Sequence, residues 1–385
     1  MKRSILQAGF AAMLVTGCQS ESSAQADASK DRPFTVTEIA DFGTPWAMAF
    51  LPGSGLPMTN MALLTEKDGR LWLVDASTGK RTAVSGVPKV VVAGQGGLGD
   101  VKPHPDFAGN RRVYLTYVEG GPGGTSGAVL GYGTLDLADA SAPVLKDFKV
   151  IWRQQPKGDG HGHFSHRIAF GPDGFLYLSS GDRQEMAPAQ DLGGNLGKVL
   201  RLTHEGQPAP GNPYASRGGV AAEFWSIGHR NLLGLEFAPD GRLWEAEMGP
   251  KGGDEVNLIL PGRNYGWPSV SNGSHYDGEA IPDHQAGDGF EAPKAWWTPS
   301  ISPGALMIYS GDKFPQWKGD AFVGALSGEA LIRLDIEGDQ ARKADQWPMG
   351  ARIRSVEQGP DGSIYLLQDG NSGGKLLKLD APAAR

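Results

Sequence analysis

The chain has 385 residues and a formal net charge of −7, and this acidic balance excludes the basic footprint with which proteins bind nucleic acid. Hydrophobic residues make up 39% of the chain and ten residues are tryptophan, which excludes a disordered chain. The 57 glycines and 27 prolines are therefore expected to mark turns in a folded protein that is long enough to bury a sizeable core.

The first residues of the chain have the pattern of an export signal. Met1-Lys2-Arg3 is followed by an apolar run to about Val15 and then by Thr16-Gly17-Cys18. This order gives a charged start, a short apolar core and a small-residue cleavage site. Residues 15–18 further resemble a bacterial lipobox, in which the cysteine is lipidated and becomes the mature N-terminus. A plain secretory signal with an incidental cysteine is the alternative.

These features predict a signal peptide over residues 1–17 and a flexible tether, rich in Ser, Ala, Gln and Asp, over residues 18–32. The apolar run is too short to span a bilayer, so a lipid on Cys18 would be the only membrane link. We therefore expect a periplasmic protein that is lipid-anchored through Cys18. Because Cys18 is the only cysteine, a disulfide framework and a thiolate metal cluster are excluded.

One turn-and-strand unit recurs between residues 33 and 385. In each copy, a turn containing Gly, Asp or Asn precedes a short run of apolar, β-branched or aromatic residues. The turns of the six copies are Asp68-Gly69, Gly109-Asn110, Asp173-Gly174, Asp240-Gly241, Gly319-Asp320 and Asp361-Gly362. Their spacing runs from 41 residues (68 to 109) to 79 residues (240 to 319). A four-stranded propeller blade needs roughly 40 residues, so the longer intervals would carry inserted loops.

The sequence thus predicts an all-β fold, a six-bladed β-propeller with inserted loops that forms one domain over residues 33–385. A large β-sandwich or barrel with chance Asp-Gly hairpins is the alternative, because such hairpins are common. In a propeller, the radially repeated sheets leave a central channel. Loops at one end of that channel are the natural place for a functional site.

Three histidines lie close together just before a strand-like segment. On extended chain, His161 and His163 share a face and His166 lies on the other. No cysteine and no second histidine pair at metal-ligand spacing is available, so zinc is disfavoured. A histidine on a loop facing the channel is a plausible general base near neutral pH.

The stretch from Trp225 to Pro268 is dense in polar residues and tight turns. Arg230 and Asn231 offer a cation and an amide side by side, which is often only a structural pair. Downstream, carboxylates and irregular backbone supply hard oxygen donors, and calcium takes such mixed shells. The candidate donors are Gly249, Pro250, Asp254, Glu255 and Tyr265. Their spacing matches no EF-hand loop.

Arg352 and Arg354 alternate just before the last Asp-Gly turn and so share one face of a strand. A solvated edge is the ordinary explanation of such a pair. At the mouth of a channel the same pair would form an anion site, because guanidinium groups bind carboxylates through two hydrogen bonds.

Taken in chain order, these motifs form a recognisable series. Its members are Gln95-Gly96-Gly97-Leu98, His104-Pro105-Asp106-Phe107, His163-Phe164-Ser165-His166-Arg167, Gly171-Pro172-Asp173-Gly174, Ala189-Gln190-Asp191, Leu196-Gly197-Lys198-Val199-Leu200-Arg201, Gly228-His229-Arg230-Asn231, Gly249-Pro250 with Asp254-Glu255, Asn264-Tyr265-Gly266-Trp267-Pro268 and Arg352-Ile353-Arg354. The series resembles the soluble quinoprotein sugar dehydrogenases, more closely the bacterial aldose-dehydrogenase branch than the glucose-specific one. The resemblance spans about residues 34–379.

The resemblance implies a six-bladed propeller that binds pyrroloquinoline quinone (PQQ) and calcium on top of its channel. His163 matches the family's catalytic base, which takes the proton of the anomeric hydroxyl of an aldose while hydride passes to the quinone. Arg230 and Asn231 match residues at the quinone oxygens, where Arg230 would stabilise developing charge as a second catalytic residue. Gln95 matches a residue near the same edge. The product would be a lactone, and an external electron acceptor would reoxidise the cofactor.

The remaining cofactor, metal and substrate positions also follow from the resemblance. Arg352 and Arg354 match the pair that neutralises the cofactor carboxylates. Gly249 and Pro250 match backbone carbonyls on the calcium that polarises the quinone, while Glu255 and Tyr265 match a second, structural calcium site. The residues expected at the sugar are Gln190, Asp191 and Trp297.

The chain departs from the family pattern at positions around the sugar and the cofactor. Ser165 and His166 replace small glycines often found there, and His166 is expected to reshape the sugar pocket. Gly162 stands where some relatives have a carboxylate, and Ser327 where the glucose-specific branch has a lysine. Two alternatives stay open: oxidation of another aldehyde or alcohol such as sorbosone, and a non-enzymatic propeller that binds carbohydrate or a protein partner.

Overall fold

The computed structural model describes residues 32–53 and 60–382. The predicted signal peptide, nearly all of the tether and the lipidation site Cys18 lie outside the described residues. From Phe34 onward the chain forms one compact unit. No helix in the described part of the chain is long and apolar enough to cross a membrane.

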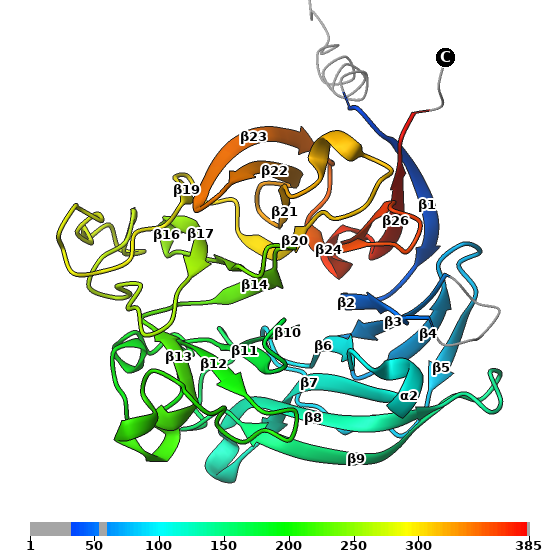
Figure 1. Ribbon diagram of the computed structural model, residues 1–385, viewed down its shortest axis with the longest axis horizontal. Helices are drawn as coiled ribbons and strands as arrows, with labels where there is room; N and C mark the ends of the chain where they lie inside the picture. Colours follow the sequence, from blue (N-terminus) through cyan, green and yellow to red (C-terminus); the bar gives the residue numbers. More distant parts are fainter. Residues whose placement is uncertain (1–31, 54–59, 383–385) are drawn as a thin grey trace, which may run out of the picture. The chain divides into compact units, whose positions relative to one another are not determined.

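Six antiparallel four-stranded sheets are arranged around a common centre (Figure 1). Blades 1 to 3 consist of β2 (Pro45–Phe50), β3 (Met61–Glu66), β4 (Leu71–Asp75) and β5 (Arg81–Val84); β6 (Leu98–Pro103), β7 (Arg112–Gly120), β8 (Ser126–Asp136) and β9 (Val144–Arg153); and β10 (Ser165–Phe170), β11 (Leu176–Ser180), β12 (Lys198–Leu202) and β13 (Phe224–Ile227).

Blades 4 to 6 follow in the same order. They consist of β14 (Leu232–Phe237), β15 (Leu243–Glu247), β17 (Asp254–Ile259) and β19 (Ala295–Trp297); β20 (Pro303–Ile308), β21 (Ala321–Ala325), β22 (Ala330–Glu337) and β23 (Gln340–Pro348); and β24 (Ile353–Gln358), β25 (Ile364–Gln368), β26 (Lys375–Asp380) and β1 (Thr35–Asp41). A two-stranded sheet of β16 (Lys251–Gly252) and β18 (Gly273–Ser274) belongs to an insertion in blade 4, and α2 (Phe107–Asn110) joins β6 to β7. The predicted six-bladed propeller is confirmed.

The two ends of the propeller unit close the ring within one blade. β1 pairs antiparallel with β26, with Thr35 opposite Asp380. Blade 6 therefore combines the first strand of the chain with the last three. This closure leaves no gap between the first and last blades, as the architecture requires.

An apolar cluster fills each interface between neighbouring blades. Between blades 4 and 5, for example, the fully buried Trp244 and Val256 pack in one cluster with Val323. The ring closes in the same way, because Leu64 of blade 1 and Tyr365 of blade 6 share a cluster. Removing a large side chain from such a core costs about 2–5 kcal/mol of stability, so the scaffold holds the loops of different blades in fixed relative positions.

Each predicted turn-and-strand unit falls in a different blade. Five of the six turns join the first strand of a blade to the second, but Asp68-Gly69 joins β3 to β4, the second and third strands of blade 1. There Gly69 has a φ of 98° and its N–H donates to the carbonyl of Glu66. Blade 1 instead joins its first two strands through residues 51–60, whose sequence contains no Asp-Gly pair.

Candidate active site

The predicted catalytic and cofactor residues come from several blades but lie at one end of the channel. Because the strands of a blade are antiparallel, the loop that leads into its first strand and the loop between its second and third strands lie at the same end. The predicted residues in or next to these loops are Gln95, His163, Arg230, Asn231, Gly249, Pro250, Arg352 and Arg354. Five of the six turns described above lie at the opposite end.

His163 has the surroundings of a general base. Its buried ring places Nδ1 2.7 Å from Oδ1 of Asp182, a carboxylate with no exposed surface. The other oxygen of Asp182 accepts the indole N–H of Trp267 at 2.8 Å. An ionised carboxylate only accepts hydrogen bonds, so this pair places the ring proton on Nδ1 and leaves the Nε2 lone pair free.

The charge state of His163 suits the same role. Burial lowers the pKa of His163 below its ordinary value, while the hydrogen bond and charge of Asp182 act in the opposite direction. The positive charges of Arg230 and Arg183 lower this pKa further. The imidazole is therefore neutral at pH 7 and can accept a proton.

The backbone of His163 is held in a conformation that few residues adopt. Its φ is 47°, in the left-handed region, and its N–H donates to Oε1 of Gln95 at 2.7 Å. Left-handed non-glycine residues cost free energy and persist only where the surroundings fix them. Gln95 therefore fixes the base, in addition to lining one of the two cavities described next.

One cavity, here called the base cavity, has a volume of about 410 Å³. Its walls contain His163, Asp182, Gln184, Met186, Arg230, Pro250, Trp267, His275, Tyr276 and Asp277. The proton acceptor and the cation predicted at the quinone oxygens thus border the same space.

The two terminal nitrogens of the Arg230 guanidinium group form hydrogen bonds within the protein, whereas its Nε does not. Its Nη1 donates to the carbonyls of Met248 and Gly249 at 2.9 and 2.6 Å, and Nη2 donates to the hydroxyl of Tyr276 at 3.2 Å. The backbone N–H of Arg230 donates to Glu247 at 2.6 Å. Nε is buried without a hydrogen-bond partner in the described residues, so a ligand oxygen would satisfy a donor that the protein leaves free.

A second cavity, here called the cation cavity, has a volume of about 270 Å³. Its walls contain Trp46, Lys67, Gln95, Phe164, Ser165, His166, Leu233, Met248, Ser302, Leu326, Arg352 and Arg354. Asn231 is fully buried behind this wall, where its amide accepts from Ser165 at 3.2 Å and approaches the sulfur of Met248.

Positive charge exceeds negative charge in the cation cavity. Arg354 forms an ion pair with Asp369 at 2.6 Å, and Nε of Arg352 lies 3.9 Å from the same carboxylate. Lys67 adds a third cation, whose pKa is lowered by burial and by the charge of Arg354. Nε of Arg352 is buried and has no hydrogen-bond partner within residues 32–53 and 60–382. Three cations thus share one carboxylate, an arrangement that suits a multiply charged anion.

A buried guanidinium group, that of Arg167, contacts residues of several blades next to the cation cavity. Arg167 donates to the carbonyls of Leu233 and Gly304, both at 2.8 Å, and its charged group lies 4.0 Å from the ring centre of Trp46. Asp100 pairs with it at 3.3 Å. Arg167 of blade 3 thus connects to four other blades, and two of its partners, Trp46 and Leu233, line the cation cavity.

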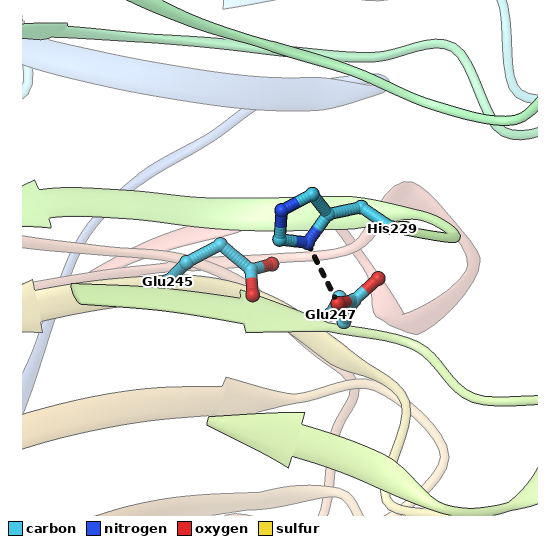
Figure 2. A group of neighbouring side chains, drawn as sticks. All are labelled: His229, Glu245 and Glu247. Carbon is cyan, nitrogen blue, oxygen red and sulfur yellow. Dashed lines mark hydrogen bonds and ion pairs between the residues drawn. The ribbon is translucent and has the colours of Figure 1, made fainter. Parts of the chain in front are cut away.

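In blade 4, three glutamates on β15 and β17 lie close to a histidine in the loop before β14. In Figure 2, His229, Glu245 and Glu247 point toward one another, and Nδ1 of His229 lies 3.1 Å from Glu247. Oε1 of Glu245 is buried and has no hydrogen-bond partner in the part of the chain that the structure describes. Burial raises the pKa of Glu245 and of Glu255 well above the ordinary value, with a further contribution from the charge of Glu247.

An ion-sized space adjoins this acidic group. It has a volume of about 10 Å³, and its walls include Glu247, Glu255 and Tyr265, which is close to the minimum that holds one water-sized particle. The structure therefore brings together Glu255 and Tyr265, the two residues predicted at a second calcium ion.

Comparison with known proteins places this arrangement in a family. The family model described as Glucose / Sorbosone dehydrogenase matches residues 42–378. The chain belongs to this family. It is 40% identical over 340 residues to the aldose sugar dehydrogenase YliI of Escherichia coli strain K12, covering 87% of this chain and 89% of that protein.

Solved structures of glucose/sorbosone dehydrogenase type have the same fold. A crystal structure of glucose dehydrogenase is 44% identical, has a TM-score of 0.83 and covers 89% of this chain and 99% of its own. The PQQ-bound form of an aldose sugar dehydrogenase from Streptomyces coelicolor is 28% identical, with a TM-score of 0.75, and covers 90% and 98% of the two chains.

Three residues predicted at the sugar are absent from the walls of both cavities in this member of the glucose/sorbosone dehydrogenase family. Gln190 exchanges amide hydrogen bonds with Asn264 at 2.7 and 3.0 Å. Asp191 accepts from the backbone of Gly193, and Trp297 is buried in the core of blades 4 and 5. Their arrangement thus provides no support for direct contact with a sugar.

The structure also describes the surroundings of His166 and Asp254. His166 lines the cation cavity and not the base cavity, and it stacks on Trp46 with ring centres 5.1 Å apart. Burial lowers its pKa to about 3, so it is neutral. Both oxygens of Asp254 already accept hydrogen bonds, from the backbone of Gly249 at 2.9 Å and from the 300–302 segment at 2.6–2.7 Å.

Several residues of the site were not identified from the sequence. Lys67 and Asp369 lie directly after the second strands of blades 1 and 6, and Asp182 lies two residues after that of blade 3. The residue directly after the second strand is Met248 in blade 4 and Leu326 in blade 5, so no polar residue repeats at this position as a signal. Tyr276, by contrast, lies in the insertion with 72% of its surface exposed, and only tertiary structure brings it to Arg230.

Proposed function

We propose that this chain is a PQQ- and calcium-dependent dehydrogenase that oxidises aldoses at the anomeric carbon to lactones. The observation that carries the proposal is the neutral His163, held by Asp182 through Nδ1 and bordering one cavity with Arg230. Family membership and the PQQ-bound Streptomyces coelicolor relative support the same conclusion.

The residues of the cation cavity fit PQQ, which is a tricarboxylic acid. Lys67, Arg352 and Arg354 outnumber their single carboxylate partner, and Nε of Arg352 and of Arg230 have no partner within the described residues. These donors would bind the carboxylates and a quinone oxygen of the cofactor. When bound, PQQ supplies the acceptor for a hydride, and an external electron acceptor, not yet identified, would reoxidise it.

In the reaction, His163 accepts the proton of the anomeric hydroxyl at Nε2. Asp182 keeps the ring in the required tautomer and stabilises the imidazolium that forms. Arg230 directs positive charge into the same cavity, where negative charge would develop. Trp267 orients the Asp182 carboxylate through its indole N–H. Protein groups therefore hold both oxygens of the carboxylate that positions the base.

Calcium is proposed at two positions. The carbonyls of Gly249 and Pro250 would bind one ion at the cofactor; the Gly249 carbonyl accepts from Arg230 at 2.6 Å, so the ion and the guanidinium would compete for this oxygen. Glu255 and Tyr265 would bind the second ion in the ion-sized space, whose wall also contains the Glu247 carboxylate. Hard oxygen donors of this kind suit calcium.

The test is reconstitution of the purified protein with PQQ and Ca²⁺, followed by an aldose panel with dye reduction as the readout. Turnover of aldoses that requires both additions is expected, and sorbosone and simple aldehydes belong in the same panel. Bound PQQ with no turnover of any aldose would contradict the proposed substrate class. A protein that binds no PQQ would point instead to a non-enzymatic propeller.

We also propose that the protein is periplasmic and lipid-anchored through Cys18, which the lipobox-like residues 15–18 support. Mass spectrometry of the mature N-terminus should find a lipid-modified cysteine, and Cys18→Ser should move the protein from the membrane fraction to the soluble one. An unmodified N-terminus in the native protein would contradict the anchor.

A further inference from the structure

We propose that Gln184 recognises the hydroxyl group next to the anomeric carbon of the aldose and thereby sets the substrate preference. The inference rests on the proposed function, because that function places the anomeric hydroxyl at His163. Gln184 is an exposed residue on the wall of the base cavity, which it shares with His163 and Arg230.

The position of Gln184 is tied to the position of the base. Its backbone N–H donates to Oδ1 of Asp182 at 2.9 Å, and the same oxygen binds Nδ1 of His163 at 2.7 Å. One buried carboxylate oxygen thus holds both residues. A shift of Gln184 relative to the imidazole would break one of these two hydrogen bonds.

The segment that carries Gln184 is strained. Arg183, Gln184 and Met186 have φ values of 58°, 64° and 59°. With His163, Ser165 and His166, they make six of the ten left-handed non-glycine residues in the described ranges. Backbone strain of this kind concentrates at functional sites, where the surrounding structure must maintain it.

Arg183 maintains the strained conformation. It is 1% exposed, donates from Nε to the carbonyl of Gly162 at 3.0 Å and from Nη1 to the carbonyl of Ser126 at 2.5 Å, and lies over the ring of Phe164 at 3.9 Å. It also donates to the carbonyl of Gly160. These contacts clamp the segment against the loop of the base.

Gly162 provides the space for the Gln184 side chain. A Cβ atom at position 162 would lie 2.3 Å from Oε1 of Gln184, so the amide occupies the place that a side chain there would take. The φ of Gly162 is not in the left-handed region, and backbone conformation therefore does not require glycine. The space is instead used to bring a neutral amide beside the residue that precedes the base.

The amide of Gln184 is free to bind a ligand. Its side chain has no hydrogen-bond partner among the described residues, in contrast to Gln95 and Gln190, whose side-chain amides are both used by the protein. A glutamine amide offers both a donor and an acceptor, which a sugar hydroxyl can use together. Placed beside the base, it would meet the hydroxyl on the carbon adjacent to the reacting one.

The test compares glucose with 2-deoxyglucose, which differ only in that hydroxyl. For Gln184→Ala loaded with PQQ and Ca²⁺, kcat/KM with glucose should fall about 5- to 20-fold, the effect of one lost hydrogen bond to a substrate, and kcat/KM with 2-deoxyglucose should change less than about twofold. The affinity for PQQ, followed by fluorescence titration, should not change.

Two further variants make the test specific. Gly162→Ala should give the same selective loss with Gln184 intact, because the new methyl group displaces only the flexible end of the amide. Glu185→Gln, an exposed neighbour outside the cavity wall, should leave both sugars within about twofold of wild type. Equal losses for the two sugars in Gln184→Ala, or no loss for either, would overturn the inference.

The wild-type protein separates this inference from the proposed function. If wild type oxidises no aldose, the proposed function fails, and the recognition role fails with it. If wild type oxidises glucose and Gln184→Ala retains the wild-type preference over 2-deoxyglucose, only the role of Gln184 is overturned.

Discussion

The two cavities lie at the same end of the propeller but differ in the charge of their key side chains. In the base cavity, burial lowers the pKa of His163 and a single hydrogen-bonded carboxylate fixes the tautomer. In the cation cavity, Lys67, Arg352 and Arg354 share only Asp369. A neutral proton acceptor suits chemistry on an uncharged sugar, whereas excess cations suit the retention of an anionic cofactor. The comparison predicts that damage to the first cavity reduces turnover and damage to the second reduces cofactor affinity.

Replacing the base should have the largest effect. For His163→Ala at saturating PQQ, we expect kcat to fall at least about 10³-fold, because general-base catalysis contributes about 10²–10⁴-fold. PQQ affinity should change little. His161→Ala is the matched control, since His161 is exposed on the same loop. A large loss of PQQ affinity in His163→Ala would remove the distinction between the two cavities.

Asp182→Asn should have the next largest effect on steady-state turnover. The amide can donate to Nδ1 of His163, which would place the ring proton on Nε2, and kcat should fall about 10²-fold or more. The carboxylate also raises the pKa of His163, in opposition to burial. Its loss should therefore move the acid limb of the residual activity to lower pH than in wild type. A limb that moves to higher pH would contradict this account.

Removing a cationic side chain from the cation cavity should weaken the binding of PQQ. In Arg354→Ala the Kd for PQQ should rise about 10- to 100-fold, as expected for the loss of a charge-assisted contact, while kcat at saturating PQQ stays within about threefold. Fluorescence titration gives the first quantity and dye reduction the second. Arg342→Ala, on the exposed outer strand β23, is the control. A fall in kcat as large as that in His163→Ala would contradict the division of roles.

Loss of calcium from the second site should have the smallest effect, and this effect is on stability and not on turnover. If calcium binds at Glu255 and Tyr265, EDTA should lower Tm by about 3–8 °C, as expected when a ligand specific for the folded state is removed. In Glu255→Gln the Tm should no longer respond to EDTA. A wild-type Tm that does not change with EDTA would contradict the second calcium site.

Much of the fold could be read from the sequence, because each blade repeats a turn followed by an apolar strand. The repeat did not show which two strands of a blade each turn connects. Asp68-Gly69 joins the second and third strands of its blade, whereas the other five turns join the first and second. His163, Arg230 and the Arg352/Arg354 pair were found because chemically distinctive residues cluster in motifs. Gln190, Asp191 and Trp297 were expected only from the resemblance, and none of them lines the base cavity or the cation cavity.

The sequence by itself determined that the chain is a propeller with a histidine, arginines and oxygen donors in its loops, since local spacing encodes turns and strands. Only the tertiary structure decided which of these residues meet. Asp182 holds His163 from 19 positions along the chain, and Trp267 reaches the same carboxylate from 85 positions away. Ring closure sets such distances, because it fixes the loops of six blades around one channel, and no local pattern records that arrangement.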